Sequence, residues 1–252
     1  MTEAKEAKYD KIKPWDIEAT NLSANFGYIL CIGIKNLNEP AKKTRIYSVD
    51  DYPLYKKDPT NDSALLEDAG KDLEDAGAWI TWYGGGFDVP FVQTRRLFHK
   101  MKPLPMVPHI DGWRIAKYKM KLNSNRLATV STFLEVEEKT ALNGPIWIKA
   151  SAGDRDALRY IKEHCVQDVI VLEQVFKKIR PLMSNSPNLS LLKSLEARDG
   201  DNQLCPICCS PELEKRGQSI TATGARQRYQ CKECGGWSRG RVERVKGLEA
   251  RS

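Results

Sequence analysis

Four acidic residues and one histidine are the side chains of this sequence best suited to metal-dependent chemistry. Asp16 and Glu18 are two positions apart at the end of a predicted strand, so they point to the same face of it. Such a pair of carboxylates repel each other unless a cation compensates them. Asp88 follows a glycine-rich turn, and Asp168 lies in a later predicted helix with His164 one turn before it on the same side.

This set of side chains suits hydrolysis of a phosphodiester with two metal ions. Carboxylate oxygens are the ligands that Mg²⁺ and Mn²⁺ prefer, and four carboxylates can hold two such ions about 4 Å apart. One ion would lower the pKa of a water molecule and orient it for attack on phosphorus, and the other would neutralise charge on the leaving 3′ oxygen. His164 would then accept the proton of that water as general base.

Two pairs of cysteines with C-x-x-C spacing predict one structural Zn²⁺ near the C-terminus. They are Cys205 with Cys208 and Cys231 with Cys234. In a reducing compartment such pairs bind metal far more often than they form disulfides, and two pairs complete one tetrahedral site. Cys209 would replace Cys208 if the first pair were shifted by one residue, but the C-x-x-C spacing favours Cys208. Metal binding would supply much of the folding free energy of so small a segment.

Basic and aromatic side chains are interleaved in the same segment. Residues 201–252 carry ten Lys/Arg against six Asp/Glu, and this excess suits phosphate contacts, while exposed rings suit base stacking. The residues predicted to contact nucleic acid are Arg226, Arg228, Lys232, Trp237 and Arg239. The alternatives are docking of a protein partner and a solvated ribbon whose aromatic residues cover its own core.

The elements that must position these residues alternate between apolar strands and amphipathic helices. Strands are predicted at 12–17, 28–34, 44–49, 78–83 and 106–110. Helices are predicted at 63–76, with Ser63 as N-cap, and at 87–100, 127–136 and 154–183, while 50–62 is expected to be a loop. Three sequential strands followed by alternating helices and strands predict an α/β layered domain.

Length and composition indicate a globular chain with one sizeable domain and one small one. We expect a catalytic domain at 1–184, a linker at 185–203, and a β zinc ribbon with a basic tail at 204–252. The formal net charge of +7 favours a polyanionic partner. No apolar stretch approaches the roughly 20 residues of a membrane span, and the N-terminus lacks the apolar core of a signal peptide, so we expect a cytoplasmic protein without membrane contact.

Three segments resemble the exonuclease motifs of the DEDD superfamily, in the same order. They are Trp15-Asp-Ile-Glu-Ala-Thr-Asn21, Gly86-Phe-Asp-Val-Pro-Phe91 and His164-Cys-Val-Gln-Asp168. The resemblance covers roughly Lys11 to Met183 and is strongest to stand-alone ribonuclease H-like exonucleases related to the proofreading domain of family-B DNA polymerases. It implies a ribonuclease H-like fold, in which helices flank a central mixed sheet.

The resemblance also implies a role for each residue of the acidic set. By it, the metal ligands are Asp16, Glu18, Asp88 and Asp168, and the general base is His164. Each residue alone also has an ordinary interpretation, such as solvated charge for the D-x-E pair, a helix N-cap for Asp88 and a helix surface for His164. The ordered combination favours a nuclease, because a copy that had lost its activity would be expected to lack at least one acid.

Some details depart from the family pattern or leave a choice open. The spacing from His164 to Asp168 is that of the branch that uses tyrosine as the base, and Tyr160, one turn earlier, is an alternative to His164. The Asn often found before the second motif is absent from Tyr83-Gly-Gly-Gly86. Asp111 is a further carboxylate, which either assists the site or caps the following segment.

The function predicted from these observations is a two-metal-ion 3′–5′ exonuclease that releases nucleoside 5′-monophosphates. Single-stranded DNA is the preferred substrate, because the resemblance is to a DNA proofreading domain, and RNA is the alternative polymer. A structure-selective endonuclease would use the same chemistry. A non-catalytic nucleic-acid-binding module is the alternative from a different class, and the sequence does not identify any protein partner.

Overall fold

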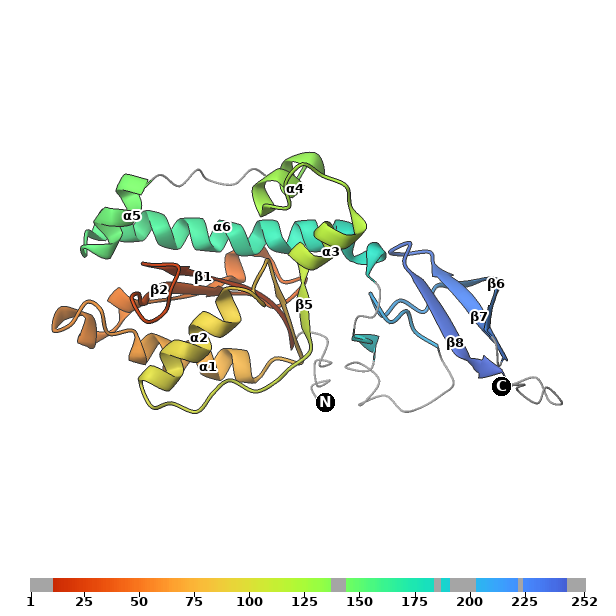
Figure 1. Cartoon of the computed structure of the whole chain (residues 1–252), viewed down its shortest axis with the longest axis horizontal. Helices are drawn as coiled ribbons and strands as arrows, with labels where there is room; N and C mark the ends of the chain where they lie inside the picture. Colours follow the sequence, from red (N-terminus) through yellow and green to blue (C-terminus); the bar gives the residue numbers. More distant parts are fainter. Residues whose placement is uncertain (1–10, 137–143, 184–186, 191–202, 222–223, 244–252) are drawn as a thin grey trace, which may run out of the picture. The chain divides into compact units, whose positions relative to one another are not determined.

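The computed structural model describes residues 11–136, 144–183, 187–190, 203–221 and 224–243 (Figure 1). The chain divides into two compact units, Met1–Lys178 and Ile179–Ser252, and each has its own sheet. Most of the predicted linker at 185–203, and the predicted tail beyond residue 243, lie outside the described residues. None of the helices in the described part of the chain is both long and apolar enough to cross a membrane.

A mixed five-stranded sheet forms the centre of the first unit. Its strands are β1 (Ile12–Ala19), β2 (Ile29–Ile34), β3 (Arg45–Ser48), β4 (Ala78–Thr81) and β5 (His109–Asp111), in the order β3-β2-β1-β4-β5. The first three strands are antiparallel neighbours, whereas β4 runs parallel to β1, and β5 runs parallel to β4. β2 is buried along its whole length, as its nearly continuous apolar sequence predicts. The predicted α/β architecture with a central mixed sheet is confirmed.

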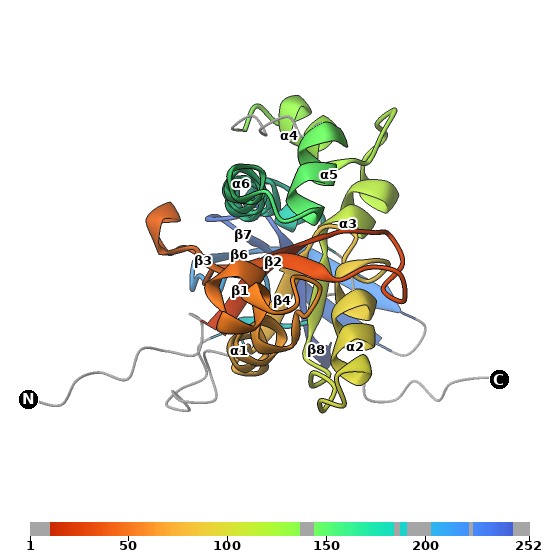
Figure 2. The same ribbon diagram turned by 90° about the vertical axis from the view of Figure 1, so that its left-hand side faces the viewer.

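Helices cover both faces of this sheet (Figure 2). The helices α1 (Ser63–Glu74) and α2 (Asp88–Phe98) lie on one face, and α5 (Gly144–Ser151) and α6 (Arg155–Ile179) lie on the other. α6 packs directly against β2, because a Cβ added to Gly33 would lie 3.0 Å from the Sγ of Cys165. Glycine at this position therefore lets the helix that carries part of the predicted site lie close to the sheet.

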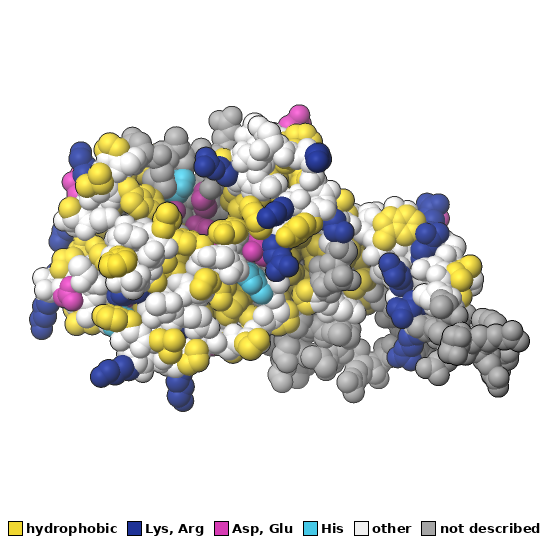
Figure 3. Space-filling model, in the orientation of Figure 1, with side chains coloured by type: hydrophobic (Ala, Val, Ile, Leu, Met, Phe, Trp, Pro, Cys, Tyr) yellow, Lys and Arg dark blue, Asp and Glu magenta, His cyan; other side chains and the backbone are white. Residues whose placement is uncertain are grey.

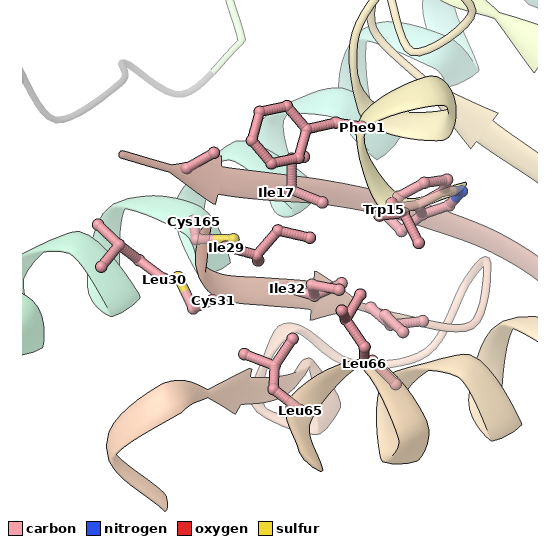
Figure 4. Close-up of a cluster of buried hydrophobic side chains, with 14 of the residues drawn as sticks. Trp15, Ile17, Ile29, Leu30, Cys31, Ile32, Leu65, Leu66, Phe91 and Cys165 are labelled. Atoms are coloured by element: carbon pink, nitrogen blue, oxygen red, sulfur yellow. The ribbon is translucent and has the colours of Figure 1, made fainter. Parts of the chain in front are cut away.

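The core between sheet and helices is apolar (Figure 4). Leu65, Leu66 and Leu73, which periodicity places on one face of α1, are all buried. Leu65 and Leu66 belong to the same cluster as Ile17 and Ile32 of the sheet. Each such side chain contributes about 1.5–3 kcal/mol when it is fully buried, so this cluster is a main source of stability for the first unit.

The prediction that Ser63 caps α1 is wrong, and the alternative interpretation of Asp88 as an N-cap is excluded. Ser63 does not cap α1, because Asp62 occupies the N-cap position and its carboxylate instead accepts hydrogen bonds from the N–H of Ile29 and from Arg95. Asp88 is not an N-cap, because Phe87 occupies that position and Asp88 is the first residue of α2. At both helix starts a carboxylate accepts a hydrogen bond from a distant backbone N–H instead of capping the helix.

Two helices and three short 3₁₀ helices were not predicted, and the first of the latter is η2 (Ala41–Lys43). α3 (Gly112–Lys119) follows β5 directly, and α5 precedes α6. The predicted loop at 50–62 contains the 3₁₀ helices η3 (Val49–Asp51) and η4 (Pro53–Lys56). The predicted helix at 127–136 is shorter, as α4 (Leu127–Phe133), and α6 ends in a 3₁₀ turn, η5 (Arg180–Leu182). Short helices carry too few apolar residues to show a clear period, which explains why α3 and α5 were missed.

A buried ion pair joins the residue that follows β2 to the C-terminal half of α6. Lys35 contacts Glu173, and their side chains are 2% and 6% exposed. Glu173 also accepts a hydrogen bond from the N–H of Asn38 at 2.9 Å and contacts Lys177 at 2.5 Å. Charges so deeply buried are tolerated only when they are paired, so this cluster fixes how α6 lies on the sheet.

The second unit is a three-stranded antiparallel sheet preceded by a short coil. Its strands are β6 (Leu213–Thr221), β7 (Gly224–Cys231) and β8 (Trp237–Glu243), in that order. Its buried apolar side chains include Ile207, which packs against Gly236 so closely that an added Cβ would lie 2.5 Å away. So small a core buries too little apolar surface to hold the sheet together alone, and a further stabilising group is expected.

Candidate active site and candidate zinc site

The five predicted catalytic residues line one cavity of the first unit. The cavity has a volume of about 310 Å³ and receives Asp16 and Glu18 from β1, Asp88 from α2, and His164 and Asp168 from α6. Figure 3 shows acidic and histidine side chains gathered in a hollow on one face of the molecule. The cavity lining includes His164 but, among the described residues, not Tyr160. The structure therefore brings the three sequence motifs together at one place.

His164 on α6 lies close to one carboxylate of β1 and to one carboxylate of its own helix. Nε2 of His164 lies 3.9 Å from Oε1 of Glu18 and 3.6 Å from Oδ2 of Asp168. All three side chains are at least nine-tenths buried, and they offer ligand atoms within 4.8 Å of one another. The i, i+4 spacing on α6 places His164 and Asp168 on the same side of the helix, as the sequence predicts.

A hydrogen bond connects the second sequence motif, which contains Asp88, to the first motif, which contains Ile17. The backbone N–H of Ile17 donates to Oδ1 of Asp88 at 3.2 Å. Burial raises the pKa of Asp88 to about 7, and the nearby charge of Asp111 acts in the same direction. The ionised carboxylate is costly in this position by itself, and a bound cation would favour it.

The donors in this cavity suit hard divalent cations. Four carboxylates line it, and none of the described residues in its lining is Lys or Arg. The negative charge is therefore not compensated by the cavity wall itself. Carboxylate oxygens from separate elements are the donor set that Mg²⁺ and Mn²⁺ take in proteins.

The turn before Asp88 is organised by Asp111. Its carboxylate accepts hydrogen bonds from the N–H of Tyr83 at 2.9 Å and of Gly85 at 3.3 Å. The same carboxylate accepts from the N–H of Trp113 at 3.1 Å and so caps α3. Of the two roles predicted for Asp111, the structure shows capping, and it adds the support of the turn that leads to Asp88.

Sequence reasoning missed the aromatic side chains beside the carboxylates. A second cavity, of about 520 Å³, shares Asp16, Asp168, Trp82 and Tyr83 with the first. Its other lining residues are Trp113, Arg126, Leu127 and Ala128. The available signal was the pair Trp82-Tyr83 immediately before the glycines of the second motif, where Tyr83 stands in the segment that lacks the family's Asn.

The four predicted zinc ligands form a cluster in the second unit. Their Sγ atoms lie within 4.8 Å of one another, with Cys205 and Cys234 3.8 Å apart and Cys208 and Cys231 3.6 Å apart. A tetrahedral site with Zn–S bonds of about 2.3 Å places its sulfur atoms about 3.8 Å apart. The cluster therefore has the dimensions of a four-thiolate zinc site.

Each cysteine pair is held by the same tight turn. The N–H of Cys209 donates to the carbonyl of Cys205, and the N–H of Gly235 donates to that of Cys231, both at 2.9 Å. Cys209 and Gly235 have φ values of 60° and 73°, so Cys209 is the counterpart of the glycine that follows the second pair. Cys209 thus has a backbone role, and Cys208 supplies the thiol of the four-cysteine cluster.

Three of the residues predicted to contact nucleic acid share one face of the C-terminal sheet. Arg228 on β7 is paired with Arg239 on β8, and the guanidinium of Arg228 lies 5.7 Å from the ring centre of Trp237. Trp237 is 50% exposed. Arg226, two residues before Arg228, is half-buried, and Lys232 is exposed in the turn of the second cysteine pair.

Comparison with known proteins identifies the family of the first unit. The model of the RNase_H superfamily matches residues 15–180. The chain belongs to the RNase_H superfamily. No curated protein matches the chain. Among solved structures, the family B DNA polymerase from the hyperthermophilic archaeon Pyrobaculum calidifontis is similar over 84% of this chain, with a TM-score of 0.52 and 11% sequence identity.

The RNase_H superfamily match and the polymerase agree on the fold. The chain spans 31% of the length of that polymerase, and at 11% identity the likeness shows the fold alone. The predicted ribonuclease H-like fold is confirmed. The span matched by the RNase_H superfamily contains all five residues of the first cavity, whereas the cysteine cluster lies outside it. Nucleases of the RNase_H superfamily use divalent metal ions, which agrees with the carboxylates of this cavity.

Proposed function

We propose that this chain is a two-metal-ion 3′–5′ exonuclease that acts on single-stranded DNA. The observation that carries the proposal is the convergence of the three DEDD-like motifs on one cavity in a member of the RNase_H superfamily. A chain that only bound nucleic acid would have no use for four carboxylates in one cavity, because they repel phosphate.

The carboxylates would hold the ions, and the histidine would handle the proton. Asp16, Glu18, Asp88 and Asp168 would hold two Mg²⁺ or Mn²⁺ ions, which would activate a water molecule and neutralise charge on the leaving oxygen. Hydrolysis forms a bond from that water oxygen to phosphorus and breaks the bond to the preceding 3′ oxygen, which releases a nucleoside 5′-monophosphate. His164, whose Nε2 faces Glu18 and Asp168, accepts the proton of the water.

The C-terminal sheet would be a zinc ribbon that adds nucleic-acid contacts. One Zn²⁺ bound by the four-cysteine cluster would fix both turns of the sheet. Phosphates and bases would meet Arg226, Arg228, Lys232, Trp237 and Arg239. A protein partner on the same face is the alternative. The cytoplasmic location expected from the sequence stays a prediction.

Two alternatives keep the same cavity but change the substrate. An RNA exonuclease would require contacts to the 2′-hydroxyl, and a structure-selective endonuclease would cleave at internal positions. The preference for single-stranded DNA rests on the resemblance to proofreading domains and on the likeness of fold to a DNA polymerase.

One experiment separates these proposals. DNA and RNA of one sequence, labelled at either the 3′ or the 5′ end, are incubated with Mn²⁺ beside Asp16→Ala. We expect a DNA ladder that shortens from the 3′ end and is absent with the variant. Internal cleavage would instead identify an endonuclease, and faster shortening of RNA would change the substrate. No metal-dependent cleavage of either polymer would contradict the proposal.

A further inference from the structure

We propose that Trp147 of α5 is a positioning residue, which holds the end of β1 in the place from which Glu18 binds metal. Its indole N–H donates to the backbone carbonyl of Ala19, the residue after Glu18, at 3.0 Å. Trp147 itself lies outside the lining of both cavities. This inference rests on the proposed two-metal function and adds to it a residue that acts through the strand.

β1 leaves the regular register of the sheet immediately after Glu18. Glu18 pairs with Cys31 of β2, but Ala19 pairs with Ile29, so Leu30 is passed over. A bulge of this kind bends a strand, increases its twist and re-aims the side chain beside it, and bulges are frequent next to active sites. The direction of the Glu18 carboxylate therefore depends on how the bulge is held.

The carbonyl of Ala19 needs a hydrogen-bond donor at this bulge. Ala19 is 6% exposed, so water has little access to it. A buried carbonyl without a donor costs free energy comparable to a lost hydrogen bond, and the strand end would move towards water to avoid that cost. The indole of Trp147 supplies the donor from another element. Because Glu18 is the neighbour of Ala19, its carboxylate would move with the strand end.

α5 lies beside the end of β1 and is attached there by a second hydrogen bond (Figure 1). The hydroxyl of Tyr28 donates to the carbonyl of Ser151, the last residue of α5, at 2.9 Å. The carbonyl of Tyr28 in turn accepts from the N–H of Thr20, the residue after Ala19, at 3.0 Å. Trp147 is also partly buried against the apolar core of the first unit. α5 is therefore held in the position from which Trp147 reaches β1.

A small displacement of Glu18 would weaken metal binding. Its carboxylate lines the cavity, with Oε1 3.9 Å from Nε2 of His164. Mg²⁺ requires near-octahedral geometry with bonds of about 2.1 Å, and ligands have to be held within about 0.5 Å of the productive arrangement. A ligand next to an unsupported bulge would have to be ordered when the ion binds, and this ordering would lower the affinity.

The indole nitrogen is the part of Trp147 that carries this role. Phenylalanine would fill most of the same space against the core but would leave the carbonyl of Ala19 without this donor. The chain also offers a matched control, because Tyr28→Phe removes a hydrogen bond of similar length between the same helix and the sheet without touching Ala19. The two variants therefore separate the support of β1 from the attachment of α5.

Binding of Mn²⁺ to the full chain tests the inference without any substrate. The electron paramagnetic resonance signal of free Mn²⁺ reports how much of the ion is bound. We expect Trp147→Phe to raise the Kd for Mn²⁺ about fivefold, the effect of one hydrogen bond on an equilibrium constant. Tyr28→Phe should bind Mn²⁺ as the wild type does. Unchanged affinity in Trp147→Phe would overturn the inference. An equal loss in both variants would overturn it too, because attachment of α5 would then explain the effect.

Kinetics give a readout that a general loss of stability would not produce. In Trp147→Phe the Mn²⁺ concentration for half-maximal cleavage should rise about fivefold, as the Kd does. The value of kcat at saturating Mn²⁺ should stay near that of the wild type, because the bound ion then holds Glu18 in place. A lower kcat with an unchanged requirement for Mn²⁺ would contradict the positioning role.

Hydrogen exchange of the wild-type protein provides a test that does not depend on the folding of a variant. If the bond from Trp147 to Ala19 favours metal binding, metal must favour the bond by the same factor, since the coupling is reciprocal. Mg²⁺ should therefore slow exchange of the Trp147 indole N–H, measured by NMR. Exchange that Mg²⁺ does not change would overturn the inference.

The wild-type protein also separates this inference from the proposed function. Mn²⁺ binding and cleavage by the wild type, with Trp147→Phe indistinguishable from it, would defeat the role of Trp147 alone. A wild-type protein that binds no Mn²⁺ and cleaves no polymer would defeat the proposed function and this inference with it.

Discussion

The backbone N–H of Ile17 donates a hydrogen bond to Oδ1 of Asp88 at 3.2 Å. Ile17 lies between Asp16 and Glu18 on β1, and Asp88 is the first residue of α2. The bond therefore fixes the carboxylate of the helix against the strand that carries the two others. A preorganised set of ligands binds cations without a further ordering cost, so this contact would prepare the site for metal.

Asp88→Asn should separate this structural role from metal binding. Asparagine keeps an oxygen that can accept from Ile17, so the melting temperature should change little. Removal of one charged ligand should lower the rate by about 10²–10³-fold, the usual effect of deleting one electrostatic contact to the transition state. Single-turnover cleavage of labelled DNA measures the rate, with Asp156→Asn, whose side chain is 85% exposed, as control. A wild-type rate would show that Asp88 is not a ligand.

His164→Ala should slow cleavage by about 10²–10⁴-fold and spare metal binding, because general bases contribute this much to the rate. Calorimetric titration with Mn²⁺ measures binding, and loss of both ions would assign His164 as a ligand instead. His164→Tyr should keep more activity than the alanine variant, since the motif spacing is that of the tyrosine branch. His109→Ala controls for removal of a histidine from another part of the same unit.

The cysteine cluster should bind about one zinc per chain. Cys205→Ser combined with Cys231→Ser removes one ligand from each pair, so the zinc content should fall to near zero and the C-terminal sheet should become sensitive to proteolysis. Elemental analysis and limited proteolysis measure these effects. Cys209→Ser, whose residue lies outside the four-cysteine cluster, should keep its zinc. Undiminished zinc in the double variant would refute the assignment.

The basic face of the C-terminal sheet should contribute to DNA affinity. Replacing both Arg228 and Arg239 by Ala should weaken binding and reduce the slope of log Kd against log salt by about 0.7 for each phosphate that the protein no longer binds. Lys215→Ala is the matched control. Lys215 pairs with Tyr229, the neighbour of Arg228. Because successive residues of a strand point to opposite faces, Lys215 lies on the face opposite to Arg228. An equal effect of Lys215→Ala would show general attraction rather than a binding face.

Glu173 should make the first unit sensitive to acid. Burial opposes its ionisation, but hydrogen bonds from Lys177, Lys35 and Asn38 outweigh this and hold its pKa below the ordinary value. A lowered pKa means that the unfolded chain binds more protons in acid, so this stabilisation is present above about pH 4.5 and is lost as the pH falls through the folded pKa.

Replacement of Glu173 tests this directly. Glu173→Gln should cost about 3 kcal/mol near neutral pH, because Lys35 stays buried without its charged partner. The cost should shrink towards pH 3. Urea unfolding between pH 3 and pH 7 measures it, with Glu163→Gln on the exposed side of the same helix as control. A cost that did not change with pH would argue against this role of the pair.

The sequence by itself determined which side chains lie together within one strand or one helix. The alternation of a strand places Asp16 and Glu18 on one face, and one helical turn places His164 beside Asp168, so each pair is set once its own element forms. The C-x-x-C spacing likewise places the two cysteines of each pair in one turn, whereas the fold of the second unit brings the two pairs together. The buried apolar run of β2 and the leucines of α1 predicted their place in the core for the same reason.

Only the tertiary structure decided which residues from distant segments of the chain contact each other. Asp62 serves the N–H of Ile29 rather than a helix end, and Asp111 supports the turn at Tyr83, because packing brought a better donor to each carboxylate. The second cavity brings together Trp82, which follows β4, and Trp113 of α3, and no spacing in the sequence relates them. Sequence periodicity records the geometry within one element, whereas the walls of a cavity are set by how the elements pack.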